Sequence, residues 1–399
     1  MVRHATAMRK HVQKLLNHQR DILSPQAVEG IQIAIRQLKD AVAAKADKAT
    51  LEKQMENLEN VAGKWIKPYA NPAWRENVEV LLVALTVAMG IRTFFLQPFK
   101  IPTGSMQPTL YGVTSVPDFS HGPYEPWMQP EPTNFDIPTG LQRVREWFEG
   151  VSYLHLMAEE DGELTAIDPP FRILIFNIWQ TLVVGNKSYT LWFPPDYGQP
   201  RLQDRAGIHP GQFFHKGDDI VKMKVRAGDH LFVDRVSYNF RAPERGEIIV
   251  FETKGIEGLP QDQFYIKRMV AMGNEQVQIG DDRHLRINGK RVDASTPHFE
   301  KVYGFNPNDP PRESQYSGHV NESVVRKYYP DFRGSLARLF PDESAVYPVK
   351  PDHYMVMGDN TMNSLDSRTW GDFPASNVIG KSFFVYWPIT ERFGVGYHR

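Results

Sequence analysis

The feature that most constrains this chain is one apolar run, VEVLLVALTVAMGIRTFFL, from Val78 to Leu96. Fourteen of its nineteen residues are apolar, and a helix needs about 20 mostly apolar residues to span a bilayer. Its charged residues, Glu79 and Arg92, lie near the ends, where long side chains reach the membrane interface. A buried core helix is the alternative. The run favours a single transmembrane helix over residues 77–97.

Basic residues near the run predict its orientation. Lys64, Lys67 and Arg75 precede it. After Lys100 no Lys or Arg occurs until Arg143. Because cytoplasmic flanks are enriched in Lys and Arg, we expect a cytoplasmic N-terminus and an extracytoplasmic C-terminal part. About 77 residues precede the run and no A-x-A-like site closes it, so a cleavable signal peptide is not expected.

Residues 1–76 are expected to be helical and cytoplasmic. Apolar residues recur at helical spacing in two stretches: Ile31, Ile35, Leu38 and Val42, then Leu51, Met55 and Leu58. The dipeptide Ser24-Pro25 is typical of a helix start, with Ser as N-cap and Pro in the first turn. A short helical hairpin or coiled coil is the simplest interpretation, and it is a candidate surface for self-association.

From Lys100 onward, short strands and turns replace the helical pattern. A long irregular stretch is marked by Pro117, Pro123, Pro126, Pro130, Pro132 and Pro138. Six segments are rich in β-branched and aromatic residues: FRILIFNIW, YTLWF, HLFVDRVSY, EIIVFE, YIKRMVAM and SFFVYW. Gly185-Asn186 is a hairpin turn between the first two. We therefore expect residues 98–399 to form a mainly antiparallel β domain, with sheets or a barrel-like arrangement.

Composition narrows the possible chemistry. The chain has no cysteine, which excludes disulfides, thiolate nucleophiles and Cys-ligated metals. Its 46 basic and 47 acidic residues nearly balance, so no global field favours nucleic acid as a partner. None of the 13 His residues falls in an H-E-x-x-H motif or another close metal-ligand pairing. No metal and no organic cofactor is expected.

A serine directly after the apolar run is the candidate nucleophile. The stretch FKIPTGSMQPTL presents Ser105 between Gly104 and Met106. Such a serine is ordinarily a turn residue, and a nucleophilic serine needs a neighbouring base. No G-x-S-x-G elbow or recognisable Ser/His/Asp signature occurs. A base of another kind is therefore required.

Lys267 in FYIKRMVAM is the candidate base, because burial on an apolar strand would lower the pKa of its ammonium group. Side chains alternate along a strand, so Lys267 and Arg268 are expected to point to opposite faces. A solvated strand lysine is the alternative.

A third segment, MGDNTMNSLDSRTWG from Met357 to Gly371, is rich in residues that build tight, side-chain-bonded turns. Asp366 and Arg368 are a candidate ion pair, and Ser364 is a candidate hydrogen-bonding group near an active centre. A well-capped turn with no further role is the alternative.

Together these segments resemble the type I signal peptidase family, membrane-bound serine proteases that remove signal peptides from exported proteins. The resemblance covers Val78 to Leu110 and Ala227 to about Pro388, through PFKIPTGSMQPTL, AGDHLFVDRVSY, PERGEIIVFE, YIKRMV and MGDN...NSLDSR in the family's order. It implies a signal-peptidase-type β domain held by one transmembrane helix at the plasma (inner) membrane. Membrane lipid and the signal peptides of exported preproteins, with Ala-x-Ala-like cleavage sites, are the implied partners.

The resemblance implies roles for the first two motifs. Ser105 would be the nucleophile and Lys267 the general base. Thr103 matches the family's hydroxyl position two residues before the nucleophile. Its side chain would form the oxyanion hole together with the backbone N–H of Ser105.

The third motif would support this pair. By the same resemblance Ser364 orients the lysine amine, while Asp366 and Arg368 brace the surrounding loop. The motif departs from the family at Thr361 and Met362, where an Arg-Asp pair is common. After YIKRMV, AMGNE replaces the usual Gly-x-Pro-Gly-Asp. These departures leave the loop geometry and the substrate range open.

Two stretches, at about 113–226 and 297–347, are insertions relative to the family pattern. Trp179, Trp192 and Phe193 in the first are expected to pack in the β core, and a position at the membrane interface is the alternative. Two other functions compete with a signal peptidase. One is a catalytically silent, membrane-anchored β scaffold or interaction protein, and the other is a different Ser/Lys protease such as a self-cleaving repressor.

Overall fold

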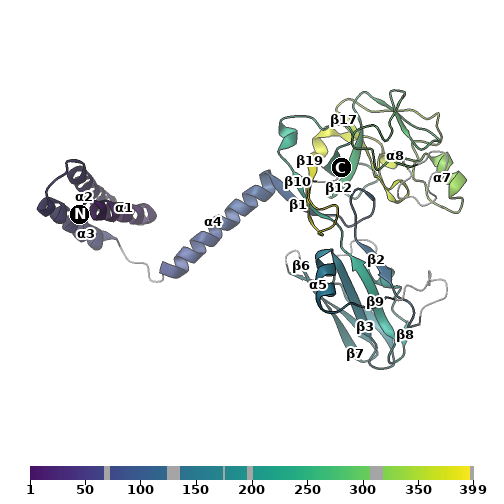
Figure 1. The fold of residues 1–399 in the computed structure, drawn as a ribbon, viewed down its shortest axis with the longest axis horizontal. Coiled ribbons are helices and arrows are strands. Elements are labelled where there is room, and N and C mark those ends of the chain that lie inside the picture. The colour runs from purple at the N-terminus through teal and green to yellow at the C-terminus, as the bar shows by residue number, and fades with distance from the viewer. Residues whose placement is uncertain (67–71, 124–134, 174–175, 196–200, 306–317, 396–399) are drawn as a thin grey trace. The chain divides into compact units, whose positions relative to one another are not determined.

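The computed structural model describes residues 1–66, 72–123, 135–173, 176–195, 201–305 and 318–395 (Figure 1). It divides into two compact units, Met1–Ala88 and Met89–Arg399. Several residues used in the predictions above lie outside the described ranges: Lys67, Pro126, Pro130, Pro132 and residues 174–175 of the FRILIFNIW segment. Parts of both insertions lie outside them too.

The first unit begins with three helices, α1 (Val2–Gln19), α2 (Pro25–Ala43) and α3 (Lys48–Trp65). They bury a common apolar core made of Ala5, Val12, Leu16, Ile31, Ala34, Ile35, Leu38, Leu58 and Ala62. The Ser24 hydroxyl caps α2 by accepting the N–H of Ala27 at 3.3 Å, as expected. The predicted hairpin or coiled coil is wrong in one respect, because α1 also carries an apolar stripe and packs against both other helices.

Helix α4 spans Pro72–Phe94. By length and composition its segment Trp74–Phe94 is able to cross a membrane, and no residue of its most apolar window is buried within the described chain. That exposure contradicts the alternative of a buried core helix. The helix ends before the predicted limit of residue 97, and Leu96 already lies in a strand. Pro98 explains the early end, because proline cannot donate to a helix and disfavours helical geometry at the preceding residue.

The second unit is mainly β, as predicted. Its central seven-stranded antiparallel sheet has the order β1 (Leu96–Lys100), β10 (His230–Asp234), β19 (Val378–Trp387), β11 (Ile248–Glu252), β12 (Phe264–Met272), β17 (His353–Met357) and β18 (Phe373–Pro374). A four-stranded sheet has the order β15 (Lys290–Arg291), β14 (Leu285–Ile287), β13 (Gln276–Ile279) and β16 (Tyr347–Pro348). Two short helices, α7 (Glu322–Tyr328) and α8 (Ser367–Trp370), complete this part.

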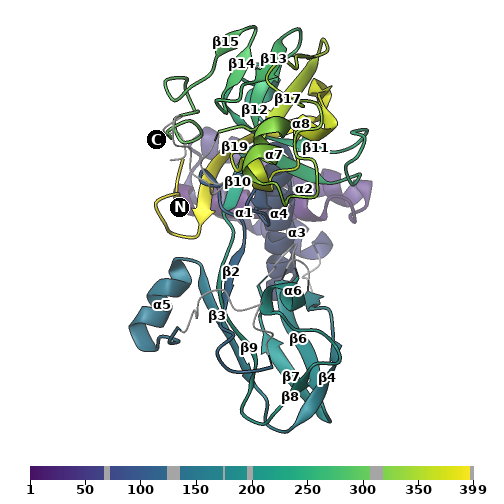
Figure 2. The ribbon, with the colours of Figure 1, turned by 90° about the vertical axis from the view of Figure 1, so that its right-hand side faces the viewer.

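The first insertion folds into two further sheets. One consists of β2 (Thr114–Pro117), β9 (Asp219–Arg226) and β3 (Val151–Met157), which lie side by side in Figure 2. The other contains β5 (Phe171–Ile173), β6 (Phe176–Val184), β4 (Gly162–Ile167) and β8 (Phe213–Phe214), with β7 (Lys187–Trp192) paired to β6. Helices α5 (Gly140–Phe148) and α6 (Leu202–Ala206) belong to the same region.

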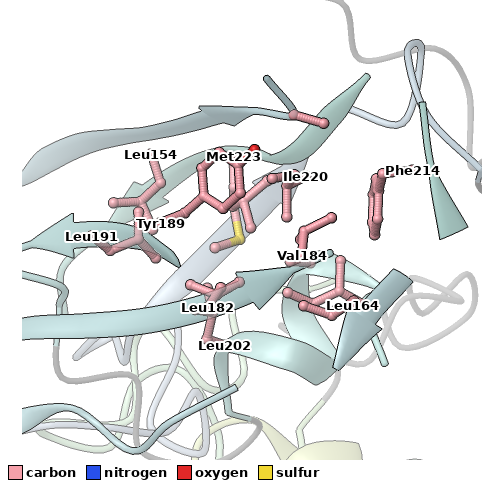
Figure 3. Close-up of a cluster of buried hydrophobic side chains, with 14 of the residues drawn as sticks. Leu154, Leu164, Leu182, Val184, Tyr189, Leu191, Leu202, Phe214, Ile220 and Met223 are labelled. Carbon is pink, nitrogen blue, oxygen red and sulfur yellow. The ribbon is translucent and has the colours of Figure 1, made fainter. Parts of the chain in front are cut away.

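The insertion has an apolar core of its own, in which Leu182 and Leu191 lie close to Tyr189 and Met223 (Figure 3). This core explains why the predicted burial of three aromatic residues is wrong. Strand side chains alternate, so Leu191 takes the inner face of β7 and Trp192 the outer one, where 63% of it is exposed. Trp179 and Phe193 are likewise 36% and 69% exposed. The Gly185-Asn186 hairpin turn between β6 and β7 is confirmed.

Candidate active site

The loop after β1 is held tightly against the central sheet. Ile101, Met106 and Leu110 are buried in one cluster with side chains of β10, β11 and β19. Ser105 therefore lies between two anchored residues of this loop. Gly112 passes so close to Thr103 that a Cβ at residue 112 would lie 2.2 Å from the Thr103 carbonyl. The close approach requires glycine and fixes where the loop turns back.

Lys267 on β12 meets this loop. Its Nζ donates to the Ser105 Oγ at 2.7 Å and to the Ile266 carbonyl at 3.0 Å. Lys267 is 5% exposed and Ser105 is 6% exposed. Nζ also lies 5.6 Å from the centre of the Tyr265 ring. Two residues 162 positions apart in sequence are thus joined by a direct, buried contact.

Burial lowers the pKa of the Lys267 ammonium group from 10.5 to about 8, because the charged form loses its hydration. The carboxylates of Asp366 and Asp359 oppose this shift, and the positive charge of Arg368 adds to it. Among the described residues no carboxylate lies within ion-pair distance of Nζ. The amine is therefore able to reach its neutral form at mildly alkaline pH, and a neutral amine accepts a proton.

Arg268, the next residue, points to the other side of β12 and is also buried. Its guanidinium donates to both carboxylate oxygens of Asp359, at 2.7 and 2.6 Å, and to the Gly246 carbonyl at 2.7 Å. The Thr109 hydroxyl donates to the same carboxylate at 2.5 Å. This pair ties the loop that carries Ser105 to the segment that begins at Gly358. Sequence reasoning placed Arg268 opposite Lys267 but assigned no role to it or to Asp359.

Asn360 holds the backbone around the candidate nucleophile by two hydrogen bonds. Its backbone N–H donates to the Ser105 carbonyl at 3.0 Å, and its side-chain amide donates to the Gly104 carbonyl at 3.1 Å. No acceptor for the Ser105 N–H occurs among the described residues. At Gly358 a Cβ would lie 2.5 Å from the Ser105 carbonyl and 2.2 Å from the Ser364 Oγ. Only glycine permits this packing.

Asp366 and Arg368 form a fully buried, two-pronged ion pair at 2.8 and 2.9 Å. Burial by itself would raise the pKa of Asp366, but Arg368 holds that pKa below its usual value. Asp366 accepts the Gly358 N–H at 3.0 Å. Arg368 donates to the Thr361 hydroxyl at 2.7 Å and to its carbonyl at 2.6 Å. Thr361, a departure from the family's pattern, is thus an acceptor for the bracing arginine.

Two other predicted site residues, Ser364 and Thr103, make no hydrogen bond to Ser105 or Lys267 among the described residues. The Ser364 Oγ is buried and makes no hydrogen bond to the lysine amine among the described residues, and the amine donates to the Ile266 carbonyl instead. Thr103 is exposed and is one of the residues that line the cavity, as Ser105 and Lys267 are. No group of three or more potential metal-ligating side chains occurs in the described part of the chain.

That cavity has a volume of about 1010 Å³. Its lining includes Phe264 to Lys267 of β12, together with Pro102, Thr103 and Ser105 of the loop after β1. The remaining lining residues come largely from the first insertion. Sequence reasoning missed this contribution of the insertion, because nothing in the insertion's sequence pattern relates the insertion to Ser105, which precedes most of it, or to Lys267, which follows it.

Comparison with known proteins places this arrangement in context. The family model described as "Signal peptidase, peptidase S26" matches residues 74–137 and 209–387, more than half of the chain. The unmatched residues between these ranges, 138–208, lie within the first insertion.

Individual relatives agree with the family match. A signal peptidase I of Pseudomonas fluorescens is 31% identical over 196 residues, covering 42% of this chain and 62% of the relative. A probable signal peptidase I-2 of Synechocystis is 25% identical over 168 residues, covering 42% of this chain and 59% of the relative. The chain thus spans about three fifths of the length of these relatives.

Among solved structures, a signal peptidase I of Enterococcus faecalis V583 is similar at 23% identity, covering 35% of this chain and 97% of that one, with a TM-score of 0.21. The family match extends over both the Ser105 loop and strand β12. This chain belongs to the signal peptidase family, peptidase S26.

Proposed function

We propose that this protein is a membrane-anchored serine endopeptidase that removes signal peptides from exported preproteins, with Ser105 as nucleophile and Lys267 as general base. The observation that carries the proposal is the buried contact of 2.7 Å between Lys267 Nζ and Ser105 Oγ. Serine is a weak nucleophile until a base takes its proton, and the lowered pKa of Lys267 suits that task at mildly alkaline pH.

The reaction follows from this contact. Neutral Lys267 accepts the hydroxyl proton as the Ser105 Oγ attacks the scissile carbonyl carbon and forms a tetrahedral intermediate. The resulting ammonium donates a proton to the leaving amine as the C–N bond breaks, which leaves an ester on Ser105. Water then attacks this ester, with Lys267 again taking a proton, and the acid product and free serine are released.

The negative charge of the tetrahedral intermediate needs donors. The Ser105 N–H is one candidate because the protein itself offers it no acceptor within the described residues. Thr103, which lines the same cavity, would supply the other through its hydroxyl. Each such donor is typically worth about 3–4 kcal/mol of transition-state stabilisation. Ser364 would contribute by orienting the lysine amine after a small rearrangement on substrate binding.

An extended substrate has a strand edge to bind. Strand β17 pairs with β12 only from Arg268 onward, while β11 pairs with the other edge of Phe264–Arg268. Residues Phe264–Lys267 thus turn their second edge towards the cavity. A substrate that adds there as a β-strand would gain main-chain hydrogen bonds, and its backbone would run past Ser105.

Helix α4 would anchor the enzyme in the plasma membrane as a single span, with residues 1–76 cytoplasmic and residues 98–399 outside. Its length, its exposed apolar surface and the basic residues before it support this topology. Protease treatment of sealed inside-out and right-side-out vesicles would test it. Digestion of the C-terminal domain from the cytoplasmic side alone would contradict the orientation.

Two partner contacts complete the proposal. The exposed rings of Trp179, Trp192 and Phe193 would rest at the lipid interface, and α1–α3 would mediate self-association. Sedimentation of the detergent-solubilised protein with and without residues 1–66 tests the second contact. The same oligomeric state with and without residues 1–66 would contradict self-association through α1–α3.

The test of the function is cleavage of a purified preprotein in detergent, with the product N-terminus sequenced. Wild type is expected to cut after the signal peptide, and Ser105→Ala is expected to lose that cut. A catalytically silent scaffold would leave the preprotein intact with wild type as well. Equal cleavage by wild type and Ser105→Ala would show that another group is the nucleophile.

A further inference from the structure

Helix α1 carries charged residues of one sign only. Its sequence contains Arg3, Arg9, Lys10 and Lys14 and no Asp or Glu. Solvated helix faces usually mix both signs, as α2 and α3 do. The one-sided charge thus distinguishes α1 from the two helices that it packs against, and it suits a negatively charged partner.

Three of these residues form a stripe along the outer side of α1. With 3.6 residues per turn, Arg3, Lys10 and Lys14 fall within about 40° of one another around the helix axis. All three are exposed, and together they are called the basic stripe below. Val12 and Leu16, on the other side of the helix, are buried in the core of the three-helix unit. Because packing holds α1 by that side, the basic stripe faces away from the unit.

Among the described residues, no carboxylate forms an ion pair with the basic stripe. Glu79 on α4 interacts electrostatically with Lys14, but its ion pair, at 2.7 Å, is with Arg75. The undescribed residues 67–71 contain no Asp or Glu. The other undescribed residues follow α4 in the chain, and the proposed topology places them on the opposite side of the membrane. The positive charge of the stripe is therefore available to an external partner.

The chain keeps the basic stripe near a bilayer. Nine positions separate Trp65, the last residue of α3, from Trp74, where the segment able to cross a membrane begins. Even a fully extended chain of that length spans only about 30 Å, and α1 itself is about 27 Å long. With α4 in the membrane, a lipid surface is thus always close to the stripe, whereas a nucleic acid would have to diffuse to it.

We propose that the basic stripe docks the three-helix unit on the headgroups of anionic lipids, at the face of the membrane where α4 enters. This inference rests on the proposed membrane anchoring and is independent of the peptidase chemistry. The three long side chains project from one side of the helix, so they reach a flat surface together when α1 lies parallel to it. Each Lys or Arg at an anionic lipid surface contributes a factor of about five to the binding equilibrium.

The test uses the full-length protein reconstituted into vesicles. Because the chain has no cysteine, Ala7→Cys provides a single labelling site, exposed beside the basic stripe. A fluorophore there is quenched by lipids that carry a nitroxide on the headgroup when α1 contacts the surface. The vesicles contain phosphatidylcholine alone or equal parts of phosphatidylcholine and phosphatidylglycerol in both leaflets, so the readout does not depend on orientation. We expect strong quenching with phosphatidylglycerol only, and less of it at high salt.

The decisive variant is Arg3→Gln/Lys10→Gln/Lys14→Gln in the labelled chain. Glutamine is a good helix former, so these exposed substitutions should leave α1 intact, which far-UV circular dichroism checks. Loss of three charges should lower the ratio of contacting to free label by about 10- to 100-fold on vesicles with phosphatidylglycerol.

The matched control is Arg36→Gln/Lys39→Gln/Lys53→Gln, which removes the same charge from exposed positions of α2 and α3. It should keep the quenching of the unmodified stripe. A label at Asn60→Cys, exposed on α3, should remain unquenched on the same vesicles. Equal loss of quenching in the control variant would assign the effect to net charge and overturn the stripe.

Flotation of the vesicles separates failure of the docking from failure of the anchor. Protein that floats with phosphatidylglycerol vesicles while its residue-7 label stays unquenched, or a stripe variant quenched as strongly as wild type, would overturn the docking and leave the anchor intact. Protein that does not float with vesicles would overturn the proposed anchoring itself. A label that responds to duplex DNA in detergent but not to these vesicles would make nucleic acid the partner and overturn the lipid contact.

Discussion

The two faces of strand β12 carry neighbouring cations in opposite situations. Lys267 faces the cavity with a serine hydroxyl and a carbonyl as its hydrogen-bond partners. Arg268 faces the interior with a two-pronged carboxylate partner, Asp359. Both side chains are nearly as buried as each other. Lys267 and Arg268 are therefore alike in burial and differ in their hydrogen-bond partners.

The partner decides what a buried cation does. Removing a charge from water is costly, and a bonded carboxylate offsets that cost only while both partners are present. Arg268 therefore stays charged and links the Ser105 loop to the Gly358 segment. Lys267 lacks such a partner, so burial lowers the pKa of its amine to about 8. Arg268 thus links two segments of the structure, whereas Lys267 has the lowered pKa that its proposed role as a base requires.

The largest expected effect is the loss of catalysis in Lys267→Met, which keeps the apolar stem and removes the amine. General-base catalysis contributes about 10²–10⁴-fold, and loss of one member of a nucleophile–base pair is close to loss of both. We expect kcat to fall by about 10³-fold or more, measured on a preprotein under saturating conditions. Activity within tenfold of wild type would mean that Lys267 is not the base.

On the other face, Arg268→Met should mainly affect stability. It leaves the Asp359 carboxylate buried without its ion pair, and breaking a buried pair costs about 3–5 kcal/mol. We expect the free energy of denaturant unfolding to fall by that amount. The double variant Arg268→Met/Asp359→Leu should recover part of the loss, since no unpaired charge remains. No recovery in the double variant would contradict the ion-pair account.

Lys267→Met should change stability in the opposite direction. The folded-state pKa of about 8 lies below the unfolded value of 10.5, so the native state resists protonation and wild type is penalised below pH 8. The shift corresponds to about 2–4 kcal/mol, part of which lost packing offsets. We expect the variant to be about 1–3 kcal/mol more stable at pH 7.

This gain has a defined pH dependence. Wild-type stability should rise between pH 8 and 10.5, where the unfolded chain binds more protons, so the advantage of the variant should shrink over that window. Denaturant titrations at several pH values measure it. A variant less stable than wild type at pH 7 would show that the lysine, like Arg268, is stabilised by its surroundings.

The sequence predicts the contact of Lys267 with Ser105 better than that of Arg268 with Asp359. Strand alternation is enough to place Lys267 and Arg268 on opposite faces, and the order of motifs relates Ser105 to Lys267. The sequence does not reveal that Asp359 is the partner of Arg268. These residues are 91 positions apart and meet only because β12 pairs with β17. The contribution of the first insertion to the cavity lining is hidden for the same reason.

The sequence pattern of a strand also misleads where it does not show which alternate side chains face the core. Trp192 is apolar and lies on a strand, yet it is exposed, because Tyr189 and Leu191 take the inner face of β7. A shift of one residue reverses which side chains a strand buries. Composition alone does not determine that phase, and it became visible only with the pairing of β6 and β7.

The central claim is that burial without a bonded carboxylate makes Lys267 a base at mildly alkaline pH. The pH dependence of kcat/KM for a preprotein, measured where the enzyme stays folded, tests it most directly, because this profile reports the free enzyme's essential base. We predict that kcat/KM rises tenfold per pH unit below about pH 8 and levels off above it. A rise that continues to the ordinary lysine range near pH 10.5, or a profile independent of pH from 6 to 9, would contradict the account.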